Sequence, residues 1–260
     1  MTYDLHTHSE LSDGRDRVRD MVRAAEAAGL TAVAITDHLE VNQFGGVDAE
    51  WVGSLLREVE AARSQSRVMV LAGVESSILD WKGRISVTPD LYSRLDLILA
   101  GIGWGTKGIG FYQPEDKTKA IRRLVDVYCL LATNPWVDVI AHPFNIGLFF
   151  KDLNLSEIPL TAVAEVASAF REGGVAFELN NSFWWWFPHR SPTEVREDYQ
   201  RIVEIFADNG VSFVAGSDAH SFHGVGQLSW VRRLVQRVGL REQDFLSLSA
   251  LRTRRFHRLR

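Results

Sequence analysis

In Thr31-Ala-Val-Ala-Ile-Thr-Asp-His38, an apolar run of strand length ends abruptly in an acidic residue and a histidine, and this pattern indicates the fold class. A short apolar run bounded by polar residues is typical of a buried strand in a parallel sheet. Similar runs recur along the chain with amphipathic segments between them, which indicates alternating strands and helices. The expected strands are 2–5, 31–36, 68–74, 95–100, 137–140, 175–179 and 211–216. The expected helices are 17–28, 49–64, 117–133, 158–172, 192–209 and 228–238.

This alternation favours an α/β fold, in particular a (β/α) barrel rather than an open sheet. In such barrels the catalytic groups gather at the carboxyl ends of the strands. The 260 residues contain no Pro/Gly/Ser-rich linker, so we expect a single domain over residues 1–260. The clearest long loop, residues 103–116, is a candidate lid or substrate contact.

Composition limits the classes of partner. Apolar residues make up 46% and charged residues 24% of the chain, as in ordinary globular proteins, and the formal net charge of −4 favours a small substrate over long duplex nucleic acid or an anionic membrane. The basic run 252–260 is interpreted as a solvated final helix and tail. A single cysteine, Cys129, excludes an intramolecular disulfide, and no stretch of eighteen apolar residues occurs, so we expect a cytoplasmic protein.

Polar residues of metal-binding type follow strand after strand. His6 and His8 lie two apart on an extended segment, so both imidazoles can face one ion. The other candidate ligands are Asp13, His38, Glu75, His142, Asp218 and His220. Taken singly, each has a structural explanation, such as a turn, a core histidine or a helix-start charge. Together, at the same end of successive strands, they indicate a centre that binds divalent metal ions.

The donor set also limits the metal. Zinc, manganese and iron accept mixed imidazole and carboxylate ligands. Glu75 or Asp218 could bridge two ions, whose shared water would lose a proton near neutral pH and leave hydroxide as the expected nucleophile. Asp218 and His220 are therefore also candidate catalytic residues.

The order of the motifs His-X-His, Ser-Asp-Gly, Thr-Asp-His, Gly-X-Glu, His-Pro and Ser-Asp-Ala-His resembles the PHP (polymerase and histidinol phosphatase) superfamily, over residues 4–220. The resemblance implies a distorted, TIM-like (β/α)7 barrel that binds up to three metal ions and hydrolyses phosphate esters. It also implies three ligand sets. These are His6, His8, Glu75 and Asp218 for one ion, Asp13, His38 and His220 for another, and Glu75 with His142 for the third.

The segment Phe177-Glu-Leu-Asn-Asn-Ser-Phe183, followed by Arg190, looks most like the small stand-alone PHP phosphatases rather than the proofreading domains of bacterial DNA polymerases. That resemblance makes Arg190 a candidate catalytic residue, because a guanidinium grips phosphate oxygens in a bidentate manner. The alternative for Arg190 is a solvated loop arginine.

One position departs from the pattern of those phosphatases, which usually carry a histidine ligand just after the fourth barrel strand. In this chain Gly103 stands there. The third ion site is therefore expected to bind metal weakly, to use a ligand from residues 103–116, or to be empty.

Phe183-Trp-Trp-Trp-Phe187 is a run of five aromatic residues that cannot all face one core. The exposed members would either stack on a planar substrate or form the interface of a homo-oligomer. No ligand role is assigned to His189, His223 or His257.

The leading hypothesis is a metal-dependent phosphatase that acts on a small phosphate monoester through metal-bound hydroxide. Three alternatives remain. A nuclease or nucleotide phosphatase would use the same chemistry, with bases stacked on the aromatic run. An amidohydrolase-type C–N hydrolase would need a bridging lysine that no strand end supplies. A non-catalytic binding protein with this fold would retain metal weakly and show no turnover.

Overall fold

The computed structural model describes residues 1–39, 48–103, 116–149 and 153–259. Its strands are β1 (Tyr3–Asp4), β2 (Ala32–Ile35), β3 (His38–Leu39), β4 (Met69–Ser77), β5 (Leu97–Gly101), β6 (Val139–Ile140), β7 (Ala176–Asn180) and β8 (Phe213–Gly216). Its α-helices are α1 (Val18–Ala27), α2 (Ala49–Arg63), α3 (Pro89–Arg94), α4 (Lys117–Ala132), α5 (Leu160–Gly173), α6 (Pro192–Asp208), α7 (Ser229–Val238) and α8 (Leu248–Arg258). Short 3₁₀ helices are η1 (Leu155–Glu157), η2 (Phe183–Trp186), η3 (Phe222–Gly224) and η4 (Glu242–Asp244).

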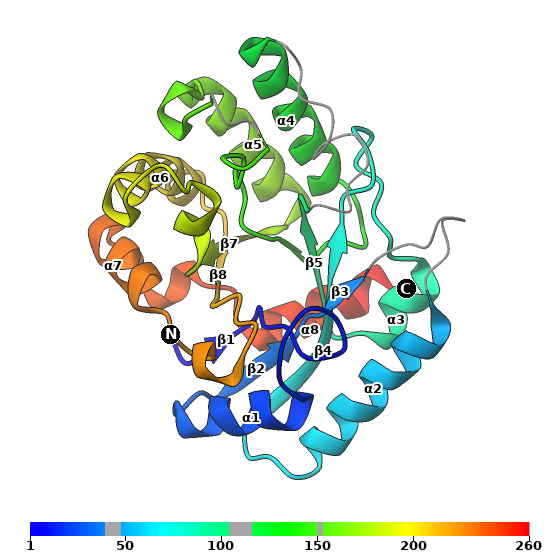
Figure 1. Ribbon diagram of the computed structural model, residues 1–260. Helices are drawn as coiled ribbons and strands as arrows, with labels where there is room; N and C mark the ends of the chain where they lie inside the picture. The colour runs from blue at the N-terminus through cyan, green and yellow to red at the C-terminus, as the bar shows by residue number, and fades with distance from the viewer. Residues whose placement is uncertain (40–47, 104–115, 150–152, 260) are drawn as a thin grey trace.

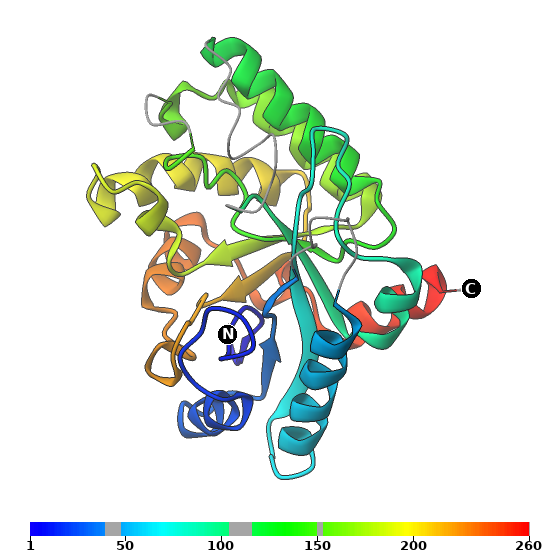
Figure 2. The same cartoon turned by 45° about the vertical axis from the view of Figure 1, so that its right-hand side comes forward.

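The strands form one parallel sheet in the order β1-β2-β4-β5-β6-β7-β8, with β3 beside β4. Its two edges meet through the backbone, where the amide of Leu5 donates to the carbonyl of Ala215 at 3.0 Å and the amide of Asp218 donates to the carbonyl of His6 at 2.9 Å. The sheet is therefore nearly closed, with helices packed around it (Figures 1 and 2). The predicted TIM-like (β/α) barrel is confirmed.

Apolar side chains fill the interior of the barrel, so it is a packed core and not a channel. They are Leu5, Ala34, Leu71, Leu97, Leu99, Val139, Ala141, Ala176 and Val214. Leu246 and Leu251 join the same cluster, and the amide of Leu246 donates to the carbonyl of Phe213, the first residue of β8. The segment that ends in α8 therefore closes the amino end of the barrel and leaves the carboxyl end for the polar side chains.

The basic run of α8 is not simply solvated, as the sequence had suggested. Arg255 is buried and forms an ion pair with Asp138, which is itself fully buried just before β6. The guanidinium of Arg255 also donates to the carbonyls of Tyr92 and Leu95 at 2.6 and 2.8 Å. The prediction is wrong for this residue because a carboxylate buried at the amino end of the barrel needs a charged partner, which α8 supplies.

The helices follow the predicted pattern closely. Gly174 after α5 and Gly210 after α6 have φ of 64° and 69°, a backbone conformation that favours glycine and ends a helix. The short helix α3 was not predicted, since six residues give little periodicity. It begins after Thr88, whose hydroxyl accepts from the amide of Leu91.

Candidate metal centre

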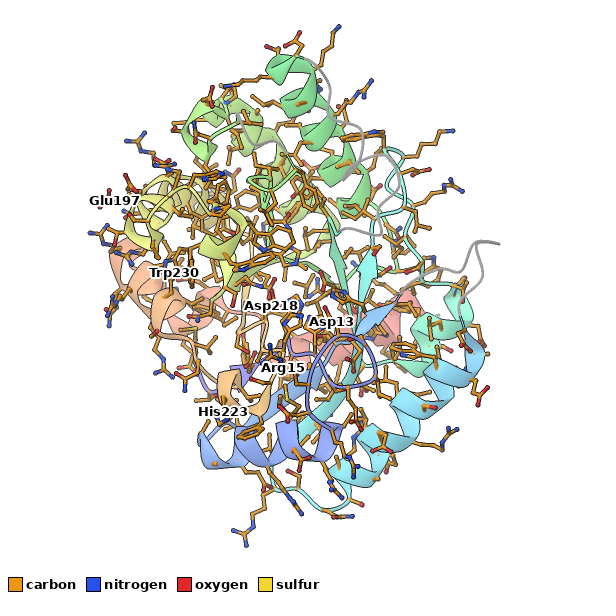
Figure 3. The ribbon with its side chains drawn as sticks, in the orientation of Figure 1. Asp13, Arg15, Glu197, Asp218, His223 and Trp230 are labelled. Atoms are coloured by element: carbon orange, nitrogen blue, oxygen red, sulfur yellow. The ribbon has the colours of Figure 1, made fainter. Side chains whose placement is uncertain are left out.

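All eight predicted ligands lie at the carboxyl end of the barrel, where Figure 3 shows Asp13 and Asp218 near its centre. His6 and His8 follow β1, and Asp218 and His220 follow β8. His142 follows β6, and Glu75 lies within β4. His38 begins β3 and pairs in register with Glu75. The parallel sheet thus brings together residues that are up to 214 positions apart in the chain (220 − 6).

The loop that carries Asp13 is folded back over β1 by a buried carboxylate. Asp37 accepts hydrogen bonds from the amide and the hydroxyl of Ser9, both at 2.7 Å, and from the hydroxyl of Ser12 at 2.6 Å. Gly14 allows this turn because a Cβ there would lie 2.4 Å from the carbonyl oxygen of His8. The loop therefore returns Asp13 to the histidines.

Glu75 lies in the middle of the centre, because four histidines from three other segments face its carboxylate. Its Oε2 lies 3.2 Å from Nδ1 of His38, 3.3 Å from Nε2 of His6 and 3.6 Å from Nε2 of His8. Its Oε1 lies 3.0 Å from Nε2 of His142. A carboxylate with each oxygen directed at a different set of imidazoles has the arrangement of a bridging ligand.

A second group surrounds Asp13 nearer the solvent. Its Oδ2 lies 3.2 Å from Nε2 of His220 and 3.4 Å from Nε2 of His38, and its Oδ1 lies 3.7 Å from Nδ1 of His8. Each of these four residues offers a ligand atom within 4.8 Å of the others. The predicted set of Asp13, His38 and His220 is thus brought together, with His8 added to it.

Asp218 connects this outer group to the buried one. Its Oδ1 lies 3.2 Å from Nε2 of His8 and 3.7 Å from Nε2 of His6. Asp218, His6 and His142 also form a group with ligand atoms within 4.8 Å. The structure therefore places His142 with Asp218 and His6 as well as with Glu75, which is a fuller third set than the sequence alone suggested.

Backbone strain at two of these residues fits a role in the site. Asp218 and His142 have φ of 58° and 30°, which non-glycine residues rarely adopt. Such conformations persist only where the surroundings hold them, and they cluster at functional sites. Asp218 is held by its own amide, which donates to His6, and by the carbonyl that accepts from Nδ1 of His220 at 2.9 Å.

Sequence reasoning missed Glu178, a buried residue of β7 that supports the ligands. Its Oε1 lies 2.7 Å from Nδ1 of His6, and its Oε2 accepts from the backbone amide of His142 at 2.6 Å. Asn180, two residues further along the same face, donates to Glu178 at 3.3 Å. The sequence could have pointed to Glu178 through the alternation of side chains along β7, which places Glu178 and Asn180 inside the barrel.

The charges of the centre shift nearly every pKa in it. Burial disfavours the charged imidazoles, yet neighbouring carboxylates outweigh it. They raise the pKa of His38 to about 11, through Glu75 and Asp13, and raise the pKa of His6 through Glu178, Asp218 and Glu75. Burial likewise opposes ionisation of Glu75, but the imidazoles of His38 and His6 hold its pKa well below the usual range. The carboxylates thus favour a positive charge on the neighbouring imidazoles, and the same carboxylates would favour a metal cation between them.

Three further ligands follow the same logic. Burial opposes ionisation of Asp218 and Asp13, but adjacent histidines keep the pKa of each carboxyl well below its ordinary value. Burial also opposes the charged form of His142, whose pKa is nonetheless raised by Glu75. His8 is the exception, because burial, together with the neighbouring imidazoles of His6 and His38, outweighs Asp218 and lowers its pKa.

The donor set fits divalent metal ions. Nε2 of His6 and Nε2 of His8 face each other at 3.0 Å, an arrangement that a shared cation explains. Nδ1 of His8 and Nδ1 of His142 are buried and find no hydrogen-bond partner in the described part of the chain, although buried polar atoms are nearly always paired. Nδ1 of His6 is held by the carboxylate of Glu178, and Nδ1 of His220 is held by the backbone carbonyl of Asp218. Metal-binding histidines typically have the ring nitrogen that does not bind the metal held in this way.

A cavity of about 950 Å³ opens above the centre and exposes its outer residues. Asp13, His38, Glu75, His142, Asp218 and His220 all border it. Its other walls include Trp51, Trp184, Trp185, Trp186 and Arg15. A small molecule can therefore reach the proposed ligands. Residues 104–115 of the proposed lid lie outside the described residues.

Arg190 is not placed at this site. Its guanidinium forms an ion pair with Asp198 of α6, and it is not among the residues that line the cavity. The expected phosphate clamp at Arg190 is therefore not supported. Arg15, which sequence reasoning passed over, lines the cavity two residues after Asp13, and its backbone amide donates to the carbonyl of His220 at 2.9 Å. The sequence feature that could have pointed to Arg15 is its position directly after the Ser-Asp-Gly motif.

Gly103, the position at which the resemblance led us to expect a histidine ligand, also borders the cavity. A Cβ added there would meet only the hydroxyl of Ser77, at 3.9 Å. The glycine is therefore not required by packing among the described residues.

The family model of the PHP domain matches residues 4–182 of this chain, which is more than half of its length. The chain belongs to the PHP-domain family. It is 29% identical over 238 residues to a protein of Acetivibrio thermocellus named "Probable phosphatase", a match that spans 91% of this chain and 87% of that protein. It is also 30% identical over 220 residues to the "DNA polymerase/3'-5' exonuclease PolX" of Bacillus subtilis, across 84% of this chain but only 34% of that longer protein.

Among solved structures, this PHP domain resembles the histidinol phosphate phosphatase of Lactococcus lactis, whose crystal structure contains zinc, L-histidinol and phosphate. The TM-score is 0.65, with 17% identity over 92% of this chain and 94% of the other. That likeness shows the shared barrel. With the phosphatases among its relatives, the chain is a hydrolase of the PHP family. In the described part of the chain, no helix has the length and apolar character needed to cross a membrane.

Proposed function

We propose that this protein is a metal-dependent phosphoesterase, formed by one domain over residues 1–260, that hydrolyses a small phosphate monoester. The observation that carries the proposal is the convergence of His6, His8, His38 and His142 on the two oxygens of Glu75 beneath an open cavity. Zinc, manganese or iron ions, two or three in number, would polarise the phosphoryl oxygens there and lower the pKa of a bound water. The ester P–O bond would break as a water oxygen bonds to phosphorus, giving phosphate and a free alcohol.

The proposed ligands are His6, His8, Asp13, His38, Glu75, His142, Asp218 and His220. His220 is best suited to act as a ligand, because Nδ1 faces the backbone carbonyl of Asp218 and leaves Nε2 to point at Asp13. Asp218 stays ionised, borders the cavity and can orient a water by accepting its hydrogen bond. The proton for the leaving oxygen then comes from water in the cavity.

Arg15 is proposed to bind the substrate phosphate in place of Arg190. It is exposed at the cavity wall and makes no ion pair with another described residue, so its guanidinium is available for a phosphate. A planar guanidinium binds two phosphate oxygens at once. Apart from the histidines, the other ionisable residues of the wall, Asp48 among them, are acidic, which favours one phosphate group over a polyanion.

A nuclease is the second candidate, because tryptophans border the cavity and could stack bases. A phosphodiester such as bis(4-nitrophenyl) phosphate separates it from the monoesterase, which should prefer 4-nitrophenyl phosphate. An amidohydrolase has less support, since no lysine lines the described part of the cavity.

The test is elemental analysis of the purified protein combined with hydrolysis of 4-nitrophenyl phosphate, before and after chelation and with each metal restored. We expect at least two metal equivalents and turnover that chelation abolishes. His8→Ala should lose metal and turnover together, whereas His223→Ala, at an exposed histidine of η3, should lose neither. Full activity of His8→Ala would show that the centre is assigned wrongly. Bound metal without phosphatase activity would point to another hydrolase, and absence of metal to a binding protein.

A further inference from the structure

The aromatic run divides into two faces because η2 is a 3₁₀ helix. With three residues per turn, side chains at i and i+3 lie on the same face. Phe183 and Trp186 are three apart and buried, at 0% and 7% exposure. Trp184 and Trp185 lie on the other face and are 39% and 52% exposed. With Phe187, which is also buried, three of the five aromatics point inward and two tryptophans lie together on the surface.

The buried face fixes this short helix in place. The ring of Phe183 stacks on Tyr199 of α6 at 3.8 Å, with 19° between the planes. Trp186 packs between the ring of Phe149 at 5.5 Å and the proposed ligand His142 at 5.2 Å. The exposed pair is therefore rigidly positioned relative to the metal centre.

The exposed face forms part of the cavity above that centre. Trp184 and Trp185 both line it, and Trp185 packs edge-on against Trp186 at 5.4 Å. Trp51 lines it from α2, and its indole N–H donates to the carbonyl of Leu11 at 2.6 Å. Figures 1 and 2 show α2 and α6, which η2 precedes, on opposite sides of the barrel. Indole rings therefore border the space beside the proposed ligands from two directions.

We infer that Trp184 and Trp185 form a stacking surface that selects phosphate monoesters whose alcohol carries a flat aromatic ring close to the phosphate. The inference rests on the proposed phosphoesterase and specifies its substrate class. An indole held in place loses little entropy on contact, and offset stacking adds to the burial of apolar area. A saturated ring of the same size would also bury apolar area against the indoles, but it would lack the additional stabilisation from offset stacking.

The experiment compares benzyl phosphate with cyclohexylmethyl phosphate, which share a six-membered ring on one methylene and differ in flatness. We expect kcat/KM to favour the benzyl ester by about fivefold in the metal-loaded wild type. Trp184→Leu and Trp185→Leu together should bring the ratio to within about twofold of unity. Phe256→Leu is the matched control, because Phe256 is also 52% exposed but lies on α8, away from the cavity.

2-Phenylethylphosphonate and 2-cyclohexylethylphosphonate, in which a methylene replaces the ester oxygen, cannot be hydrolysed at that bond, so their dissociation constants test selectivity separately from catalysis. A preference for 2-phenylethylphosphonate that the double variant removes supports the inference. Equal binding of the two phosphonates by the wild type overturns it, whether or not the esters are hydrolysed. Failure to hydrolyse either ester overturns the proposed phosphoesterase itself. A dimer that the double variant dissociates, with the ester ratio unchanged, would overturn the inference in favour of a subunit interface.

Discussion

Replacing Glu178 with glutamine should weaken metal binding by about 10- to 100-fold without unfolding the barrel. Glu178 is 1% exposed, and its two oxygens face two donors, Nδ1 of His6 and the amide of His142. Glutamine has almost the same shape but offers one oxygen and one NH₂ group. One donor must then face another donor, or the imidazole of His6 must turn its proton toward the metal.

The structure sets the size of this effect. A buried hydrogen bond to a charged group contributes about 1.5–3 kcal/mol, which corresponds to roughly 10- to 100-fold in an equilibrium constant. Zinc affinity would be measured by competition with a chromophoric chelator, and thermal unfolding in chelator would confirm that the fold is kept. Glu197→Gln is the control, because Glu197 is an exposed carboxylate on the outer face of α6 (Figure 3). Zinc binding by Glu178→Gln within about twofold of the wild type would refute the argument that this carboxylate orients His6.

Three further predictions concern the cavity and its charges. Gly103→His should raise the metal content or the affinity for the last ion, since a Cβ fits there; unchanged metal binding would mean that a histidine at 103 cannot reach the centre. Arg15→Ala should raise KM for 4-nitrophenyl phosphate about tenfold with little change in kcat, whereas Arg190→Ala should leave KM within about twofold; the reverse order would restore Arg190 as the phosphate contact. Zinc binding at pH 7 should release protons, because the carboxylates beside it raise the pKa of His38 to about 11 and a protonated imidazole must lose its proton to bind metal. Zinc affinity should therefore rise with pH, and calorimetry in buffers of different ionisation enthalpy would detect the release.

Much of the proposed centre could be read from the chain because its ligands follow strands. Each of His6, His38, Glu75, His142 and Asp218 ends or follows an apolar run, and parallel strands bring their carboxyl ends to one side. The alternation of strand and helix identified the barrel for the same reason, since local periodicity reports directly on which face is buried.

Residues that act through distant partners could not be found in this way. Arg255 looked like part of a solvated tail until α8 was seen to cover Asp138, whose burial is a property of the closed barrel. Arg190 looked available for phosphate until α6 placed Asp198 beside it. Glu178 carries no motif of its own, because its role depends on where His6 and His142 lie around it.

Strand periodicity and residue type are local properties, so they were enough to predict the barrel, the end of it that bears the chemistry and the kinds of ligand gathered there. The folded structure was needed to establish which charges are already paired, which oxygen of Glu75 faces which imidazole, and which tryptophans face the cavity. These depend on contacts between segments far apart in the chain, and the packing that fixes them exists only once the barrel has closed.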